Sequence, residues 1–322
     1  MGPYNAETTA EEVALECQSI IANKTILVTG ASAGGLGATF ATIVAKYRPA
    51  CIILATRDLA KAEATAKEIA TAAPAVRTRC TELDLASMQQ IRKAAEEINL
   101  LDEHIDVIVN NAGIMANLYT KTVDGIESQF GTNHIGHFLL TNLLLPKLLS
   151  RGQPIRIVNV SSNGFRFGPV RYEDTDFGDG KTYNRWAAYA QSKSANMLFS
   201  RALAQRFGKQ GLVSASLHPG VIWTNISRSV ATEDFAELGV LDRQLGYRSH
   251  WDHPFVAKSP SQGVATHIFA AFHPSLDSLD LNGSYLQDCG VVELEKIQSW
   301  ARDPIDARLL WDLSEKMVSQ KF

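Results

Sequence analysis

The glycine-rich segment at residues 29–37 constrains the fold of this chain more than any other feature. Its sequence, TGASAGGLG, lies between an expected apolar strand at Thr25–Val28 and an expected helix at residues 38–46. Glycines between a strand and a helix place backbone N–H groups and the positive helix end where a phosphate can bind. They also allow the tight turn and close backbone approach that a pyrophosphate needs. The segment therefore predicts a first βα unit that binds a dinucleotide.

Apolar strands and helices alternate along the rest of the chain. Strands are expected at residues 51–54, 76–82, 105–109, 156–160, 213–217 and 284–286. Helices are expected at residues 59–73, 87–100, 126–133, 135–149, 187–207, 259–272 and 305–318. Such alternation forms parallel sheets covered on both faces. The predicted fold class is α/β, a single Rossmann-type doubly wound domain of about seven parallel strands with helices on both faces, spanning residues 1–322.

Three segments lie outside this alternation. Residues 1–23 carry a capping signal and predict an N-terminal helical appendage, and residues 291–322 predict a C-terminal helical extension. Residues 224–258 lack clean periodicity. Structureless loops of this length are usually lids or binding segments. We therefore expect a substrate lid at 224–258, with Trp251 and His253 lining its pocket.

Composition excludes several functional classes. A net charge of −3 gives no electrostatic signature for binding nucleic acid. No apolar run approaches the length of a membrane span, and residues 1–23 lack the basic and apolar blocks of a signal peptide, so a cytoplasmic location is expected. The four cysteines show no metal-ligand spacing. Two pairs of histidines three residues apart could bind a metal, namely His134 with His137 and His250 with His253. No carboxylate or cysteine cluster completes either site, so no metal is expected.

The end of the second strand carries the signal for the cofactor. Arg57 follows Gly37 by about 20 residues, the distance at which this fold contacts the adenosine ribose. A guanidinium pairs with a phosphate through two hydrogen bonds, so the 2′-phosphate of NADP(H) is favoured. Asp58 keeps NAD open as the alternative.

A tyrosine and a lysine four residues apart supply candidate acid–base chemistry. Tyr189 and Lys193 lie on an expected helix, where residues at this spacing share one face. A phenol has a pKa of about 10, and a nearby ammonium favours its phenolate form. Four aromatic residues flank this pair in sequence, and both pocket lining and ordinary core packing stay open for them: Phe165, Phe167, Tyr183 and Trp186.

The glycine segment also allows a rival interpretation. Gly30-Ala-Ser32-Ala-Gly34 matches the G-x-S-x-G elbow of α/β-hydrolases, and His218 follows in the chain order of a serine esterase. A hydrolase elbow needs an earlier strand and an oxyanion loop upstream. Residues 1–23 offer neither, so the esterase using Ser32 is disfavoured.

The ordered motifs together resemble the short-chain dehydrogenase/reductase family over residues 24–290. They are the glycine segment, Asn110-Asn-Ala-Gly113, Ser161-Ser162, Tyr189-x-x-x-Lys193 and Pro219-Gly220. Residues 55–58 and 181–193 resemble the retinol-dehydrogenase-like branch, particularly its fungal members.

This resemblance implies four catalytic roles. Tyr189 matches the acid/base, and Lys193 matches the lysine that lowers the tyrosine pKa and holds the nicotinamide ribose. Ser162, rather than Ser161, matches the serine that binds the substrate oxygen. Asn133 matches the asparagine that anchors a water-linked proton relay.

The resemblance also implies the cofactor contacts. They comprise the glycine segment, the ends of the second, third and fourth strands, the catalytic pair and the segment after the sixth strand: Gly30, Ser32, Gly34, Gly35, Leu36, Gly37, Arg57, Asp84, Leu85, Asn111, Ala112, Gly113, Tyr189, Lys193, Pro219, Gly220, Val221 and Thr224. The family pattern TGxxxGxG is one residue shorter than the segment here. Whether Gly34 or Gly35 takes the place of the middle glycine therefore stays open.

The expected function is hydride transfer between NADP(H) and a carbonyl/alcohol pair, in which Tyr189 protonates the oxygen and Ser162 steadies it. The aromatic lid suggests a mid-sized apolar small molecule, such as a steroid, retinoid, lipid or polyketide-like ketone. A non-catalytic NADP-binding sensor or scaffold is the alternative, which the intact serine, tyrosine and lysine disfavour. Family members often pair through the helices at 135–149 and 187–207, which implies a homodimer or homotetramer that the lid and tail would modify.

Overall fold

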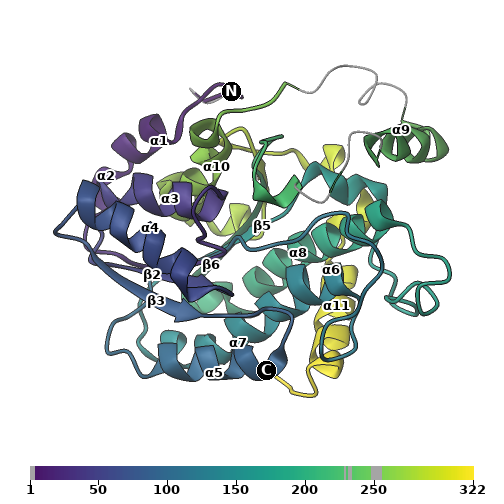
Figure 1. Cartoon of the computed structure of the whole chain (residues 1–322), viewed down its shortest axis with the longest axis horizontal. Helices are drawn as coiled ribbons and strands as arrows, with labels where there is room; N and C mark the ends of the chain where they lie inside the picture. Colours follow the sequence, from purple (N-terminus) through teal and green to yellow (C-terminus); the bar gives the residue numbers. More distant parts are fainter. Residues whose placement is uncertain (1–3, 228–229, 231–233, 248–255) are drawn as a thin grey trace.

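One eight-stranded sheet forms the centre of the molecule (Figure 1). The computed structural model describes residues 4–227, 230, 234–247 and 256–322. Seven strands are parallel and the eighth is antiparallel. In spatial order they are β3 (Arg77–Glu82), β2 (Cys51–Thr56), β1 (Thr25–Thr29), β4 (Val107–Asn110), β5 (Ile155–Val160), β6 (Leu212–His218), β7 (Tyr285–Gln287) and β8 (Gly290–Val291). The predicted fold class is confirmed, with the short β8 as an addition.

The central strands are apolar along their whole length because both faces of the sheet are covered. Every residue of β1, β2 and β4 is buried. Such strands are near-continuous hydrophobic runs rather than alternating ones. The strand order reverses between β1 and β4. In open α/β sheets, ligands bind at the carboxyl ends of the strands at such a switch point.

Helices cover the sheet in two layers (Figure 1). One layer contains α1 (Ala10–Glu16), α2 (Gln18–Ile21), α3 (Leu36–Ala45), α4 (Leu59–Ala72) and α10 (Pro260–Phe272). The other contains α5 (Met88–Asn99), α7 (Gly136–Ser150), α8 (Arg185–Phe207) and α11 (Pro304–Met317). Among the described residues, no helix combines the length and the apolar character that a membrane crossing requires.

The N-terminal segment packs against helices α3 and α10 rather than standing away from the domain. A capping box formed by Thr9 and Glu12 starts α1, and Ser261 of α10 accepts a hydrogen bond from the backbone N–H of Ala10 (3.0 Å). Val13 and Ala14 are fully buried in the same core as α3 and α10. The described part of the predicted 1–23 appendage thus contributes apolar surface to the domain core, which stabilises the fold.

The C-terminal extension packs against α7 and α8 through aromatic side chains. Trp311 of α11 is 1% exposed, and its ring lies edge-on to that of Phe138 with centroids 5.0 Å apart. Its indole N–H donates to Glu315 (2.9 Å). Helices α7 and α8 are those that the family resemblance implies for pairing between subunits.

The helix that precedes α7 contains a wide turn. Short α6 (Ser128–Phe130) continues into a π-helical turn at Gly131–Ile135 and then into α7 without a break. The sequence predicted two separate helical segments here. π-turns are rare and are frequent at functional sites, and this one carries Asn133.

The 224–258 segment contains a helix that the sequence analysis missed. Residues Asp234–Gln244 form α9, which lies at the upper right of Figure 1. The expectation of a loop without periodicity was wrong over these residues. Three side chains of α9, four residues apart, face inward: Asp234, Leu238 and Asp242. Because two of the three are aspartates in ion pairs, this inward stripe shows no hydrophobic periodicity in the sequence. The predicted roles of His250, Trp251 and His253 lie outside the described residues.

Candidate active site

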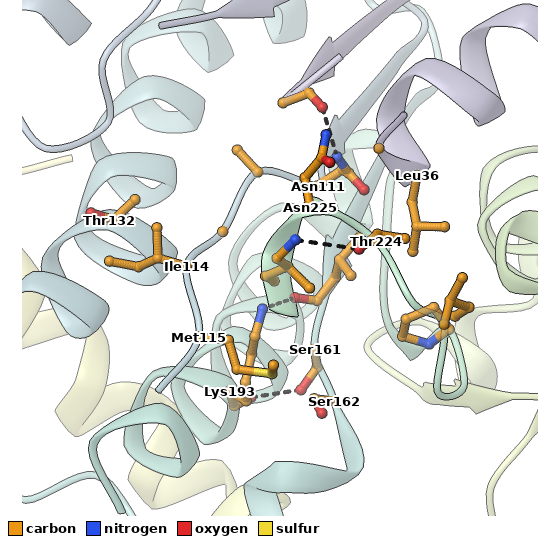
Figure 2. Close-up of a pocket in the computed structure, with 18 of the residues that line it drawn as sticks. Leu36, Asn111, Ile114, Met115, Thr132, Ser161, Ser162, Lys193, Thr224 and Asn225 are labelled. Atoms are coloured by element: carbon orange, nitrogen blue, oxygen red, sulfur yellow. Dashed lines mark hydrogen bonds between the residues drawn. The ribbon is translucent and has the colours of Figure 1, made fainter. Parts of the chain in front are cut away.

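A cavity of about 890 Å³ opens at the carboxyl ends of the strands, where β1 meets β4 (Figure 2). Most of the predicted site residues line it: Gly30, Ser32, Gly35, Leu36, Arg57, Asp84, Leu85, Asn111, Ala112, Gly113, Ser162, Tyr189, Lys193, Pro219, Gly220, Val221 and Thr224. Of the predicted site residues, all of which the structure describes, Gly34, Gly37 and Asn133 do not line the cavity.

The glycine segment brings the start of α3 close to β1. Gly35 is the N-cap of α3 and lines the cavity. Gly34 has a φ of +76° and faces the side-chain amide of Asn225. A Cβ on Gly37 would lie 2.7 Å from the carbonyl oxygen of Gly30 and 2.6 Å from Nδ2 of Asn111. The geometry favours Gly35 for the place of the middle glycine, and the segment leads into a helix N-terminus, where a phosphate can bind.

The end of β2 presents two cations to the cavity. Arg57 and Lys61 both line it. Asp58 instead caps α4 by accepting from the N–H of Ala60 (3.1 Å), and its carboxylate lies 3.6 Å from Nζ of Lys61. Lys61 was not among the sequence predictions, although its place in the first turn of the expected helix at 59–73, shortly after Arg57, could have indicated it.

Asn111 and Thr29 join the ends of β1 and β4. The Thr29 hydroxyl accepts from the backbone N–H groups of Asn111 and Ala112 (both 3.0 Å), and Nδ2 of Asn111 donates to the Thr29 carbonyl (2.9 Å). These bonds hold the two loops that line the switch-point crevice (Figure 2). After β3, which β2 separates from β1, Asp84 accepts from the N–H of Ala86 (3.0 Å) beside the cavity.

The two serines after β5 have different surroundings. Ser161 is 2% exposed, and its hydroxyl donates to the backbone carbonyl of Lys193 (2.8 Å). Ser162 caps the turn that follows, where its Oγ accepts from the N–H of Gly164 (3.1 Å), and it hydrogen-bonds Tyr189. This difference favours Ser162 for the role beside the substrate oxygen.

Tyr189 and Lys193 lie on one side of α8, and burial controls both pKa values. Nζ of Lys193 is 5.5 Å from the centroid of the Tyr189 ring and donates to the carbonyl of Val160 (2.9 Å). Burial raises the pKa of Tyr189 to about 12, an effect that the Ser162 hydrogen bond partly offsets. Burial lowers the pKa of Lys193 to about 7. Tyr189 is therefore protonated at neutral pH, and lowering of its pKa by Lys193 stays a prediction.

Asn133 connects the loop after β4 to α8. It is fully buried in the π-turn. Its Oδ1 accepts from the N–H of Ile114 (2.8 Å), and its Nδ2 donates to the carbonyl of Ile114 (2.9 Å) and to Oγ of Ser192 (2.9 Å). Ser192 in turn donates to the carbonyl of Tyr189 (2.8 Å). Asn133 thus positions two walls of the cavity, while its part in a water relay stays a prediction.

The four flanking aromatic residues divide into two pairs. Phe167 and Trp186 line the cavity. Phe165 packs edge-on against Tyr285 with ring centroids 5.3 Å apart. The Tyr183 hydroxyl donates to the Asn117 carbonyl (3.1 Å) and lies in a buried polar network.

Several lining residues were not predicted for the dinucleotide site, among them Leu238 of α9 and His218 at the end of β6, which the sequence had suggested only for the disfavoured esterase. Burial lowers the pKa of His218 to about 4, so the ring is neutral at neutral pH. Its place directly before Pro219, at the carboxyl end of a strand, could have identified it. Leu238 could not be found in this way because its position depends on how α9 packs against Phe167 and Trp186.

The fold and its switch-point crevice define the class of this protein, a Rossmann-type α/β domain of the kind that binds dinucleotides. The chain belongs to the short-chain dehydrogenase family. The family model described as short chain dehydrogenase matches residues 24–173. Retinol dehydrogenase 14 of Mus musculus is 38% identical over 92% of this chain and 86% of its own length.

Solved structures show the same architecture. An uncharacterized protein from Mycobacterium Paratuberculosis is 32% identical, with a TM-score of 0.70 over 94% of this chain and 96% of that one. A Pseudomonas aeruginosa RhlG/NADP active-site complex is 22% identical, with a TM-score of 0.60 over 82% of this chain and 94% of that one. The latter likeness concerns the fold alone. Membership of this oxidoreductase family disfavours the serine esterase interpretation, while the cofactor-binding role of Ser32 stays a prediction.

Proposed function

We propose that this protein transfers hydride between NADP(H) and the carbonyl/alcohol pair of a mid-sized apolar substrate. The observation that carries the proposal is that Ser162, Tyr189 and Lys193 line the same cavity as the glycine loop. The wall beside them is apolar, since Met115, Phe167, Trp186 and Leu238 also line the cavity. Such a surface suits a steroid-, retinoid-, lipid- or polyketide-like carbonyl compound. The relative named retinol dehydrogenase 14 supports a substrate of this kind.

The cavity fits an NADP cofactor. Gly30, Ser32 and Gly35 form a cradle without bulky side chains at the N-terminus of α3, where a pyrophosphate is stabilised. Arg57 and Lys61 would hold a 2′-phosphate, since both are cations on the cavity wall. The capping role of Asp58 favours NADP over NAD. When bound, the nicotinamide supplies or accepts the hydride.

The residues of this chain would manage the proton and the substrate oxygen. Tyr189 is protonated at neutral pH because burial raises its pKa to about 12, so in the reductive direction it would donate its hydroxyl proton to the oxygen. Ser162 would hold that oxygen by a hydrogen bond. Lys193 is buried beside the Tyr189 ring and would favour the phenolate that forms after transfer.

The test is the substitution Tyr189→Phe. It keeps the ring but removes the proton, and we expect turnover to fall by roughly 10²–10⁴-fold while NADPH binding, followed by its fluorescence, is retained. NADPH consumption would be measured across a panel of ketones and aldehydes. Tyr172→Phe is the matched control, because the Tyr172 hydroxyl bonds to the Asp306 carbonyl and lies outside the cavity lining.

Normal turnover by the Tyr189→Phe variant would remove Tyr189 from the chemistry. NADPH binding by the wild type without turnover of any carbonyl compound would instead favour the sensor or scaffold alternative. The cytoplasmic location and the homodimer or homotetramer stay predictions. The fungal-type assignment also stays a prediction, since it rests on the sequence of residues 55–58 and 181–193.

A further inference from the structure

The inward stripe of helix α9 connects the lid to the reacting residues. Its members, Asp234, Leu238 and Asp242, are four residues apart and therefore lie on one face. Leu238 and Asp242 are each 2% exposed. An acidic residue lies at each end of the stripe and an apolar residue in the middle, so the two ends can be fixed by charge while the centre contacts the cavity.

Asp242 pairs with an arginine that follows Ser162. Nη2 of Arg166 lies 2.9 Å from Oδ1 and 3.1 Å from Oδ2 of Asp242. The two side chains are 11% and 3% exposed, and the guanidinium also lies over the rings of Phe167 (4.9 Å) and Tyr247 (5.6 Å). Arg166 belongs to the short 3₁₀ turn that Ser162 caps. The ion pair therefore ties α9 to the serine segment.

Asp234 pairs with an arginine that precedes Tyr189. Nη1 of Arg185 lies 3.0 Å from Oδ2 of Asp234, and the indole N–H of Trp186 donates to the Asp234 carbonyl (3.1 Å). Arg185 is the first residue of α8, one helical turn before Tyr189. The two segments that carry Ser162 and Tyr189 thus each supply one arginine to α9. Arg166 follows Ser162 by four residues, and Arg185 precedes Tyr189 by four.

Leu238 lies between the two ion pairs and completes an apolar wall. It packs with Phe167, Trp186 and Ala190, and Met115 packs against this cluster. Leu238, Phe167 and Trp186 all line the cavity. Because α9 is held at both ends, Leu238 cannot move far without separating a buried or half-buried charge from its partner, which is strongly unfavourable.

We propose that this stripe sets the size of the apolar substrate. Leu238 limits the room beside the reacting carbonyl, and Arg166 and Asp242 are positioning residues that fix where Leu238 sits. The proposal rests on the carbonyl/alcohol function proposed above. Leu238, held in place by the ion pairs of α9, would thus determine which apolar substrates fit the cavity.

The experiment uses a ladder of 2-alkanones from four to sixteen carbons, with kcat/KM measured for Leu238→Ala and Leu238→Trp. Leu238→Trp should lower the ratio of long-chain to short-chain kcat/KM by roughly tenfold or more, and Leu238→Ala should raise it, since single methylene changes in a pocket alter discrimination about 10-fold or more. Val240→Ala is the matched control, because Val240 is 48% exposed on the same helix. Ratios within twofold of wild type for both Leu238 variants would overturn the proposal.

The ion pair is tested with Asp242→Asn and the conservative Asp242→Glu, using Arg243→Gln on the exposed side of α9 as control. Asp242→Asn should raise KM for long alkanones more than it lowers kcat, and Asp242→Glu should restore most of the difference. Equal loss of kcat and NADPH binding would instead indicate general damage and contradict a positioning role. Where Asp242→Asn fails to fold, the Leu238 variants decide alone.

Failure of the proposed function can be told apart from failure of this inference. Binding of the ladder is also measured, by displacement of the fluorescent fatty acid cis-parinaric acid. Absence of turnover in the wild type would count against the carbonyl/alcohol function. The dependence of displacement on chain length in the Leu238 variants would still support or overturn the role of the stripe.

Discussion

Replacement of Lys193 by methionine is expected to stabilise the protein at neutral pH while abolishing turnover. Lys193 is 2% exposed, and burial lowers its pKa from 10.5 to about 7. A methionine fills similar space without a charge to desolvate. The carbonyl of Val160 would lose one donor but keep the hydrogen bond from Nδ2 of Asn196 (3.0 Å).

The size of the effect follows from the pKa difference. Each unit is worth about 1.4 kcal/mol, so folding with Lys193 buried costs about 4 kcal/mol at pH 7. Loss of the hydrogen bond to Val160 offsets about 1 kcal/mol of the gain, which leaves a net stabilisation of about 3 kcal/mol. Between the folded and unfolded pKa values the unfolded chain holds more protons, so wild-type stability rises with pH in this window. The advantage of the variant should therefore shrink by about 2 kcal/mol between pH 7 and pH 9.

The measurement is urea unfolding of both proteins at pH 7 and pH 9, followed by circular dichroism. Lys209→Met is the control, because Lys209 is an exposed lysine beyond the end of α8, and its substitution should show no such pH dependence. A Lys193→Met variant that is less stable than wild type at pH 7 would refute the reasoning. So would a stability difference that stays constant between the two pH values.

Three further substitutions test other parts of the structure. Arg57→Ala should lower the preference for NADPH over NADH in kcat/KM by roughly 10–100-fold, the worth of one charge-assisted hydrogen bond; an unchanged ratio would exclude Arg57 from cofactor choice. Gly37→Ala should weaken NADPH binding and lower the melting temperature, because its Cβ would lie 2.7 Å from the Gly30 oxygen and 2.6 Å from Nδ2 of Asn111; wild-type affinity by fluorescence titration would contradict this. Trp311→Ala should reduce the free energy of unfolding by about 3–5 kcal/mol, measured in urea, and a loss below about 1 kcal/mol would show that α11 contributes little.

Most of the sheet could be predicted from the sequence because its central strands β1, β2 and β4 are buried on both faces. Residues such as Leu27, Ile53 and Ile108 lie in short apolar runs between helices, and these runs mark parallel strands without any alignment. The motifs at the strand ends could then be placed together, since the carboxyl ends of parallel strands share one edge. The cavity accordingly contains Tyr189, Lys193 and the glycine loop.

The rest could not be predicted because it depends on contacts between distant residues. The inward stripe of α9 contains two aspartates, and their partners Arg166 and Arg185 are about 50 to 80 residues earlier in the chain. A hydrophobic period cannot reveal a helix held by ion pairs. Strand β8 is only two residues long, and the division of the four flanking aromatic residues between cavity and core depends on side-chain packing.

The π-turn at Gly131–Ile135 makes chain length, as well as residue identity, a determinant of the cavity. Asn133 faces Ile114 and Ser192, while His137, just beyond the turn, meets the Thr29 hydroxyl with its Nε2 (2.8 Å). Deletion of one residue here would rotate the preceding helix relative to α7 by about 100°. Asn133 and His137 could not then both keep their partners. Surface loops tolerate insertions and deletions of single residues. In this turn, such a change would instead move Asn133 or His137 away from its partners.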